Sequence, residues 1–196
     1  LCVPGTMTMV ARWASIEAQR DAQRASNDDF RPSAFTMFAY AVAKALPHHP
    51  AFRSSLIGDA TLRTYRHANL GIAVGLPGDE LVLAVVPQSD TLDWRTFAEA
   101  TKEKIALARS GKDQVDETVT VSLTNLQAQA VRDGIPVVVP PAVATLFLGE
   151  PYWGFEPGAD VPAPCKLVNL GLTFDHRIAN GIGAAAFLAE IREKVE

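Results

Sequence analysis

Cysteine is scarce in this sequence: Cys2 and Cys165 are the two present, and they form neither a disulfide framework nor the spacing of a metal site. Long apolar runs are also missing, since no stretch approaches the roughly 20 residues of a membrane helix and no signal peptide opens the sequence. The net charge of −4 and the pI near 5.6 do not provide the clustered positive face that phosphate binding needs. We therefore expect no membrane, nucleic-acid or metal binding, and a reducing, cytoplasmic setting.

Apolar residues are plentiful, at 48% of 196 residues, which is enough to bury one core and predicts a single domain over residues 1–196. Alternation predicts strands at 6–13, 69–74, 81–86, 118–126 and 167–174, a hairpin at 53–65 broken by Gly58-Asp59, and a buried strand ending at 149. Helical spacing predicts helices at 15–26, at 34–45 after Ser33, at 92–109 after Asp90 or Thr91, and after Asn180. Residues 156–164 are expected to form a surface loop, and His48 and His49 a solvated turn, because no third metal ligand is near.

The stretch from 167 to 181 changes from strand to helix period through a polar corner that contains His176. His176 has the parity of the apolar strand residues, so its imidazole points inward if the strand persists that far. An imidazole with an ordinary pKa of about 6.5 is a plausible proton acceptor near neutral pH. The alternative is a satisfied buried histidine at a strand end. Asp175 and Arg177 are expected to form an ion pair or to bind backbone groups at the corner.

The second informative stretch is 118–126, where valines and a leucine take one face of a strand. The other face is expected to present four hydroxyls in register, from Thr118, Thr120, Ser122 and Thr124. Such a row is common on the polar face of a β-branched strand and also suits the binding of a developing negative charge.

Four phrases, in this order along the chain, carry a family resemblance: 69–74 (Asn-Leu-Gly-Ile-Ala-Val), 120–126, the Pro-Pro-x-x-Ala run at 140–144, and Asp175-His176-Arg177 with Gly181. The chain resembles the catalytic domain of the dihydrolipoyl acyltransferases of 2-oxo acid dehydrogenase complexes, which share their fold with chloramphenicol acetyltransferase. The resemblance extends from Thr6 onward. It implies an α+β fold, a two-layer sandwich in which helices cover a mixed β-sheet.

The resemblance implies a CoA-dependent acyltransferase with no acyl-enzyme and no metal. His176 would be the general base and Thr124 the oxyanion donor, with Asn180 as the third catalytic position and Ser122, Asn125 and Gly181 near the substrate. Coenzyme A is a substrate rather than a bound cofactor, and a lipoyl or phosphopantetheine group would come from another domain or chain. The expected assembly is a homotrimer with its active sites at subunit interfaces, open to a carrier domain or other multienzyme components.

Two departures from the family pattern keep other functions open. The family usually has Asp where this chain has Asn180, and residues 127–134 do not follow its glycine-rich loop. One rival is a trimeric scaffolding domain without chemistry, and another is a different enzyme on the same fold that uses His176 as a base. Lipoyl and subunit-binding segments and an apolar tail are absent from the sequence, so we expect a free trimer.

Overall fold

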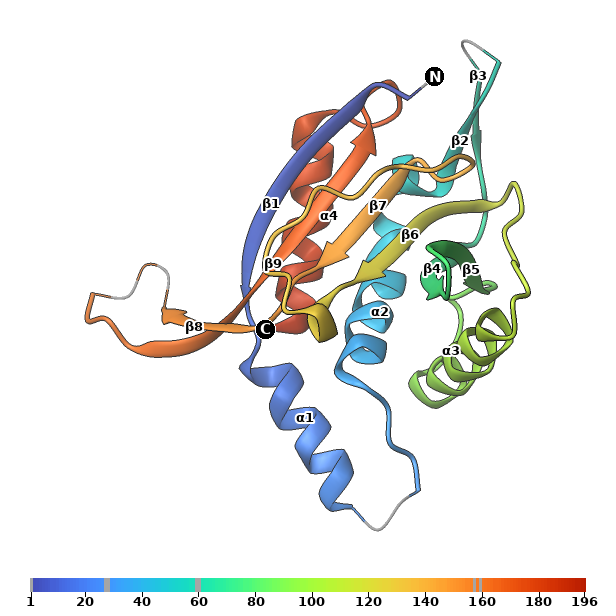
Figure 1. Ribbon diagram of the computed structural model, residues 1–196. Coiled ribbons are helices and arrows are strands. Elements are labelled where there is room, and N and C mark those ends of the chain that lie inside the picture. Colours follow the sequence, from blue (N-terminus) through green and yellow to red (C-terminus); the bar gives the residue numbers. More distant parts are fainter. Residues whose placement is uncertain (1, 27–28, 59–60, 157, 159) are drawn as a thin grey trace.

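A mixed β-sheet of seven strands organises the computed structural model, which describes residues 2–26, 29–58, 61–156, 158 and 160–196 (Figure 1). The strands are β1 (Pro4–Arg12), β4 (Asn69–Leu76), β5 (Glu80–Val86), β6 (Val119–Asn125), β7 (Ala144–Leu148), β8 (Tyr152–Phe155) and β9 (Pro164–Asp175). Their order is β1-β9-β7-β6-β4-β5, and β8 pairs with the first part of β9. β6 is parallel to β4 and β7, whereas the remaining pairs are antiparallel.

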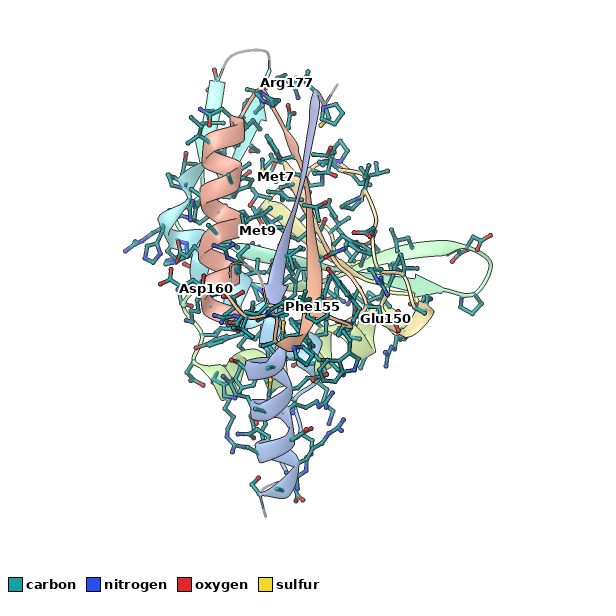
Figure 2. All side chains as sticks on the ribbon, turned by 90° about the vertical axis from the view of Figure 1, so that its left-hand side faces the viewer. Met7, Met9, Glu150, Phe155, Asp160 and Arg177 are labelled. Carbon is teal, nitrogen blue, oxygen red and sulfur yellow. The ribbon has the colours of Figure 1, made fainter. Side chains whose placement is uncertain are left out.

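Helices cover one face of this sheet, where the apolar residues of the alternating strands meet them. The helices are α1 (Ala14–Ala25), α2 (Ala34–Ala45), α3 (Trp94–Arg109) and α4 (Gly181–Val195). In Figure 1, α2 and α4 lie behind the sheet, and Figure 2 shows Met7 and Met9 of β1 on the side of α4. The shared core includes Leu70, Ile72, Val121, Leu123, Leu146, Leu170, Leu172, Phe38 and Phe187. The predicted two-layer α+β architecture is confirmed.

The predicted 53–65 hairpin is present as β2 (Ser54–Ile57) and β3 (Thr61–Thr64), which pair antiparallel. Asp59, half of its expected turn, lies outside the described residues, as do two residues of the expected 156–164 loop. α2 begins after Ser33, whose hydroxyl accepts a hydrogen bond from Thr36 N, as its sequence predicts.

The start of α3 differs from the prediction, because its N-cap is Asp93 rather than Asp90 or Thr91. The Asp93 carboxylate accepts a hydrogen bond from Thr96 N at 2.9 Å. Asp90 is used elsewhere: its carboxylate accepts a 2.8 Å hydrogen bond from Ala68 N and lies 3.2 Å from a ring nitrogen of His67. Because the Asp90 carboxylate binds Ala68 and contacts His67, it does not cap the helix. α3 therefore begins later, after Asp93.

The prediction of a solvated turn at His48 and His49 is wrong for His49, whose side chain is only 15% exposed. Its Nε2 lies 2.8 Å from one oxygen of Glu190 on α4, and His48 Nδ1 lies 2.7 Å from the other. The His49 ring also packs against Phe187. His48 ends the short 3₁₀ helix η1 (Leu46–His48), and His49 lies between it and η2 (Pro50–Arg53). Their contacts with Glu190 join this segment to α4.

The sheet face turned away from the helices is crossed by residues 126–143, drawn in yellow to orange at the front of Figure 1. Two glycines let this segment lie directly on the strands. A Cβ at Gly149 would sit 2.2 Å from the Arg132 carbonyl oxygen, and one at Gly171 would sit 2.9 Å from that of Gly134. Apart from η3 (Gln127–Gln129), the segment forms no regular element within the described residues, so hydrogen bonds such as Glu150 N to Val131 O (2.8 Å) hold it.

Candidate active site

His176 lies one residue beyond the end of β9, in an exposed turn. Its backbone N–H donates to the carbonyl of Val3 at 2.7 Å, and its ring lies 5.6 Å from that of Phe174, centroid to centroid. An inward-pointing imidazole was expected if the strand persisted as far as His176; the strand stops at Asp175 and the chain turns there, so this condition is not met. The exposure of His176 equally excludes a satisfied buried histidine, so the imidazole is open to an incoming molecule.

Asp175 is the last residue of β9, and its side chain is only 6% exposed. It accepts hydrogen bonds from Arg177 N and Nε, both at 3.0 Å, and from Arg177 Nη2 at 2.5 Å. The hydrogen bond from the Arg177 side chain is the largest cause that holds the pKa of Asp175 below its ordinary value. The predicted ion pair is therefore confirmed, and Figure 2 shows Arg177 at this end of the sheet.

Asn180 completes the corner as the N-cap of α4. Its side-chain oxygen accepts a hydrogen bond from Gly183 N at 2.8 Å, and Gly181 is the first helical residue. The capping role predicted for Asn180 is confirmed. No neighbouring atom lies within 4 Å of a Cβ placed on Gly181, so the space beside it is open.

The row of four hydroxyls predicted on β6 is reduced to two. Between Asn69 and Leu70 the register with β6 shifts, so that Thr120 becomes an extra residue on β6. Its hydroxyl is buried and donates to the carbonyl of Phe52 at 2.7 Å. Ser122 and Thr124, beyond the shift, share the sheet face that residues 126–143 cross.

A cavity of about 350 Å³ lies on this face, beside Ser122 and Thr124. Ser122 Oγ lies 2.9 Å from Thr145 Oγ1, which donates to the carbonyl of Val137 at 3.0 Å. Thr124 is half-buried, and within the described residues its hydroxyl has no hydrogen-bond partner. Of Ser122 and Thr124, it is therefore Thr124 whose hydroxyl can donate a hydrogen bond to a bound molecule.

The structure does not bring all the predicted site residues together in one chain. His176, Asn180 and Gly181 lie at the corner, and none of them lines the cavity beside Thr124. Asn125 is not a lining residue either, since its side-chain oxygen accepts a hydrogen bond from Gln127 N at 3.0 Å and fixes the turn after β6.

Sequence reasoning missed most of the cavity wall. The additional lining residues are Ala73, Leu81, Val82, Leu83, Asp113, Val115, Leu126, Gly134, Ile135, Pro136, Val137, Val139, Pro140, Thr145 and Phe147. Strand alternation could have placed Ala73 opposite the core face of Leu70 and Ile72. The residues after β6 carry no periodic signal, so only the fold shows that they cover the cavity.

Within the described part of the chain, no group of three histidine, cysteine, aspartate or glutamate side chains could hold a metal ion. The helices described also fall short of the length and apolar character needed to cross a membrane.

Known proteins similar to this chain share both its sequence and its fold. The dihydrolipoyllysine-residue acetyltransferase component of the acetoin cleaving system of Bacillus subtilis is 32% identical over 158 residues, 80% of this chain. The chain spans 39% of the length of that protein. Chloramphenicol acetyltransferase shows the fold alone, with a TM-score of 0.66 at 12% identity over 98% of this chain and 88% of that one.

The structure of the dihydrolipoamide acetyltransferase of Azotobacter vinelandii superposes with a TM-score of 0.90 at 25% identity, covering 99% of this chain and 82% of that one. It was studied for the role of a serine, a histidine and an asparagine in its catalytic mechanism. Those residues are separated by 52 and four positions, the intervals that separate Thr124, His176 and Asn180. An asparagine four residues after the histidine therefore also occurs in the Azotobacter enzyme.

Residues 6–196 match the family described as 2-oxoacid dehydrogenases acyltransferase (catalytic domain). The match covers nearly the whole chain and includes both the His176 corner and the Thr124 cavity. The chain belongs to this family of acyltransferase catalytic domains.

Proposed function

We propose that this domain transfers an acyl group between the thiol of a dihydrolipoyl group and that of coenzyme A. The observation that carries the proposal is that one chain holds both an exposed histidine, fixed at a corner by its backbone, and a hydroxyl without a partner in an open cavity. Both groups stand at the intervals found in the Azotobacter enzyme. The lipoyl group would be delivered by another domain or chain.

The reaction needs a base and an oxyanion donor. A thiol with a pKa of about 8.5 is mostly protonated at pH 7, so His176 takes its proton as the sulfur attacks the thioester carbonyl carbon. The Thr124 hydroxyl donates a hydrogen bond to the oxygen that becomes negative. When the carbon–oxygen double bond reforms, the bond to the first sulfur breaks, and the imidazolium returns the proton to the departing thiolate. No acyl-enzyme and no metal is required.

The two groups would meet between copies of the chain, because His176 does not line the cavity beside Thr124. The rim of that cavity is apolar and open: Ile135 and Val137 are each 76% exposed, and Val139 is 57% exposed. Exposed apolar side chains gathered around a site favour burial against another subunit. We propose a homotrimer whose sites each take His176 from one copy and Thr124 from the next, docking a carrier domain of a multienzyme complex. The single-domain organisation and the cytoplasmic location stay predictions.

Mixing two inactive variants tests this assignment. His176→Ala and Thr124→Ala are each expected to lose turnover of acetyl-CoA with dihydrolipoamide, measured by thioester formation. After the two are unfolded together and refolded as a mixture, every trimer that contains both has one site with an intact histidine and an intact threonine. The mixture should therefore recover about a quarter of the wild-type rate.

Separate refolding of each variant is the control. Recovery in the mixture alone confirms shared sites between copies. If both variants stay inactive when mixed although sedimentation shows trimers, the histidine and threonine do not cooperate across an interface. If neither variant loses activity, the proposed roles are wrong.

A further inference from the structure

The floor of the Thr124 cavity is a row of side chains from four neighbouring strands. Thr124 pairs with Phe147 of β7, and on its other side β4 runs parallel with Ile72 opposite Leu123. The next residue of β4, Ala73, therefore stands beside Thr124 and pairs in turn with Leu83 of β5. Ala73 is the smallest member of this row, and it lines the cavity together with Thr124, so it occupies the least of the space beside that hydroxyl.

The walls of the cavity are apolar apart from three hydroxyls and one charge. Leu81, Leu83, Val115, Ile135, Val137, Val139 and Phe147 surround it. The charge is that of Asp113, whose carboxylate accepts hydrogen bonds from the backbone N–H groups of Leu83 (3.0 Å) and Val115 (3.3 Å). Among the described residues, no lysine, arginine or histidine lines the cavity.

The single negative charge and the lack of a cation around the cavity favour neutral acyl groups over acyl groups that carry a carboxylate. A carboxylate in a cavity with apolar walls loses hydration and needs a cation or several donors in return. In this chain it would find Asp113 instead, an exposed carboxylate of the same sign that accepts hydrogen bonds from two backbone N–H groups. The cation next to His176 in sequence, Arg177, is paired with Asp175.

We propose that the acyl group transferred here is neutral and apolar, and that Ala73 sets how large it can be. This inference rests on the proposed function, because it assigns the space beside Thr124 to the acyl chain. It predicts that acetyl and short branched groups such as isobutyryl are substrates. Dicarboxylic acyl groups such as succinyl, which carry a free carboxylate, are excluded by Asp113 and the missing cation.

The first test compares acetyl-CoA, isobutyryl-CoA and succinyl-CoA as donors to dihydrolipoamide with the wild-type chain. We expect kcat/KM for succinyl-CoA to be at least about tenfold below that for either neutral donor. Turnover of succinyl-CoA equal to or above that of the neutral donors would overturn the acyl assignment and leave the transferase function intact. Absence of turnover with all three donors would contradict the transferase function itself.

The second test changes the cavity floor. Ala73→Leu fills the space beside Thr124, so the ratio of kcat/KM for isobutyryl-CoA to that for acetyl-CoA should fall about tenfold or more. Ala186→Leu adds the same side chain to an exposed position of α4 and should leave the ratio unchanged. An unchanged ratio in a folded Ala73→Leu trimer would show that the acyl chain does not lie over Ala73.

A third variant supplies the missing cation and does not depend on the tolerance of Ala73. Leu83→Lys places an ammonium group opposite Ala73, and it should raise kcat/KM for succinyl-CoA relative to acetyl-CoA severalfold. If succinyl-CoA gains nothing while the variant still uses acetyl-CoA, the acyl chain lies elsewhere and the proposal fails.

Discussion

The His176 corner and the Thr124 cavity are built in opposite ways. At the corner, the side-chain contacts between residues of the turn are short in sequence, since Asp175 binds Arg177 and Asn180 caps α4 through Gly183, while a backbone hydrogen bond to Val3 attaches the turn to the residue that precedes β1. The cavity takes its floor and walls from β4, β5, β6, β7 and the segment that crosses them. The corner thus presents one exposed group on a fixed support, whereas the cavity provides a space with a free hydroxyl. In the proposed mechanism, the corner supplies the base for proton transfer and the cavity selects the substrate.

Removal of the imidazole should have the largest effect. His176→Ala should reduce kcat about 10²- to 10⁴-fold, because the base that takes the thiol proton is gone. Its side chain is exposed and its backbone N–H remains bonded to Val3, so the melting temperature should stay within about 2 °C of wild type. Steady-state thiol release and thermal unfolding measure the two effects. A decrease of less than about threefold in kcat would remove His176 from the mechanism.

On the cavity side, Thr124→Val should reduce kcat about 10²- to 10³-fold, since one oxyanion donor is lost from a nearly isosteric side chain. Thr124→Ser keeps the hydroxyl and should retain most activity. Thr61→Val, on the exposed strand β3, is the matched control and should behave as wild type. Equal rates for the valine and serine variants would show that the hydroxyl does not act in the reaction.

Substitution of a residue that supports the corner should lower the stability of the fold more than it changes the reaction rate. Asp175→Ala leaves Arg177 and two backbone N–H groups without their acceptor, which should lower the free energy of unfolding by about 1–3 kcal/mol at pH 7. The pKa of Asp175 is lowered in the folded state, so its contribution is present above its unfolded pKa of about 3.9 and is lost as pH falls through the lower folded value. Urea unfolding should therefore show the difference between wild type and variant shrinking below about pH 4. A difference that grows on acidification would contradict this assignment.

A smaller loss is expected at the helix cap. Asn180→Ala removes the acceptor for Gly183 N and should cost about 1 kcal/mol of stability, whereas Asn180→Asp should be nearly neutral because both residues cap well. Chemical denaturation measures both, and turnover of the aspartate variant shows whether the amide acts beyond capping. If the alanine variant is as stable as wild type but inactive, Asn180 acts in the reaction and not through the helix.

The same contrast explains how much could be predicted from sequence. The ion pair and the Asn180 cap were predictable because each joins residues within a few positions, so both follow from local pattern. The end of β9 was also close to its prediction, since the strand ends at Asp175 and was predicted to end at residue 174. On β6 the alternation was correct for Ser122 and Thr124, but the register shift at Thr120 depends on pairing with β4, which a single strand does not encode.

Long-range pairing also explains the elements that were missed. Asp90 has the residue type and position of a helix cap. Its carboxylate nevertheless contacts Ala68 and His67, which are more than 20 residues away in sequence. The exposed setting expected for His49 likewise ignored Glu190, which lies 141 positions further along the chain. In each case a polar side chain bonded to a partner distant in sequence instead of its local alternative.

The contact between Glu190 and the two histidines lies apart from both halves of the site and should give the smallest effect. Burial alone would raise the pKa of Glu190, but the hydrogen bonds from His48, His49 and Lys194 outweigh it, so its pKa is lowered. The stabilisation is thus present above the unfolded pKa of about 4.3 and is lost as pH falls through the lower folded value. Glu190→Gln keeps the shape and part of the hydrogen bonding, so it should cost less than about 1 kcal/mol at pH 7 and still less below pH 4. Urea unfolding at the two pH values tests the stability effect, and unchanged acyl transfer would show that this contact holds α4 without entering the chemistry. Loss of activity from Glu190→Gln at full stability would instead show that the contact between Glu190 and the two histidines acts on the His176 corner through α4. The view that this contact only supports the fold would then be wrong.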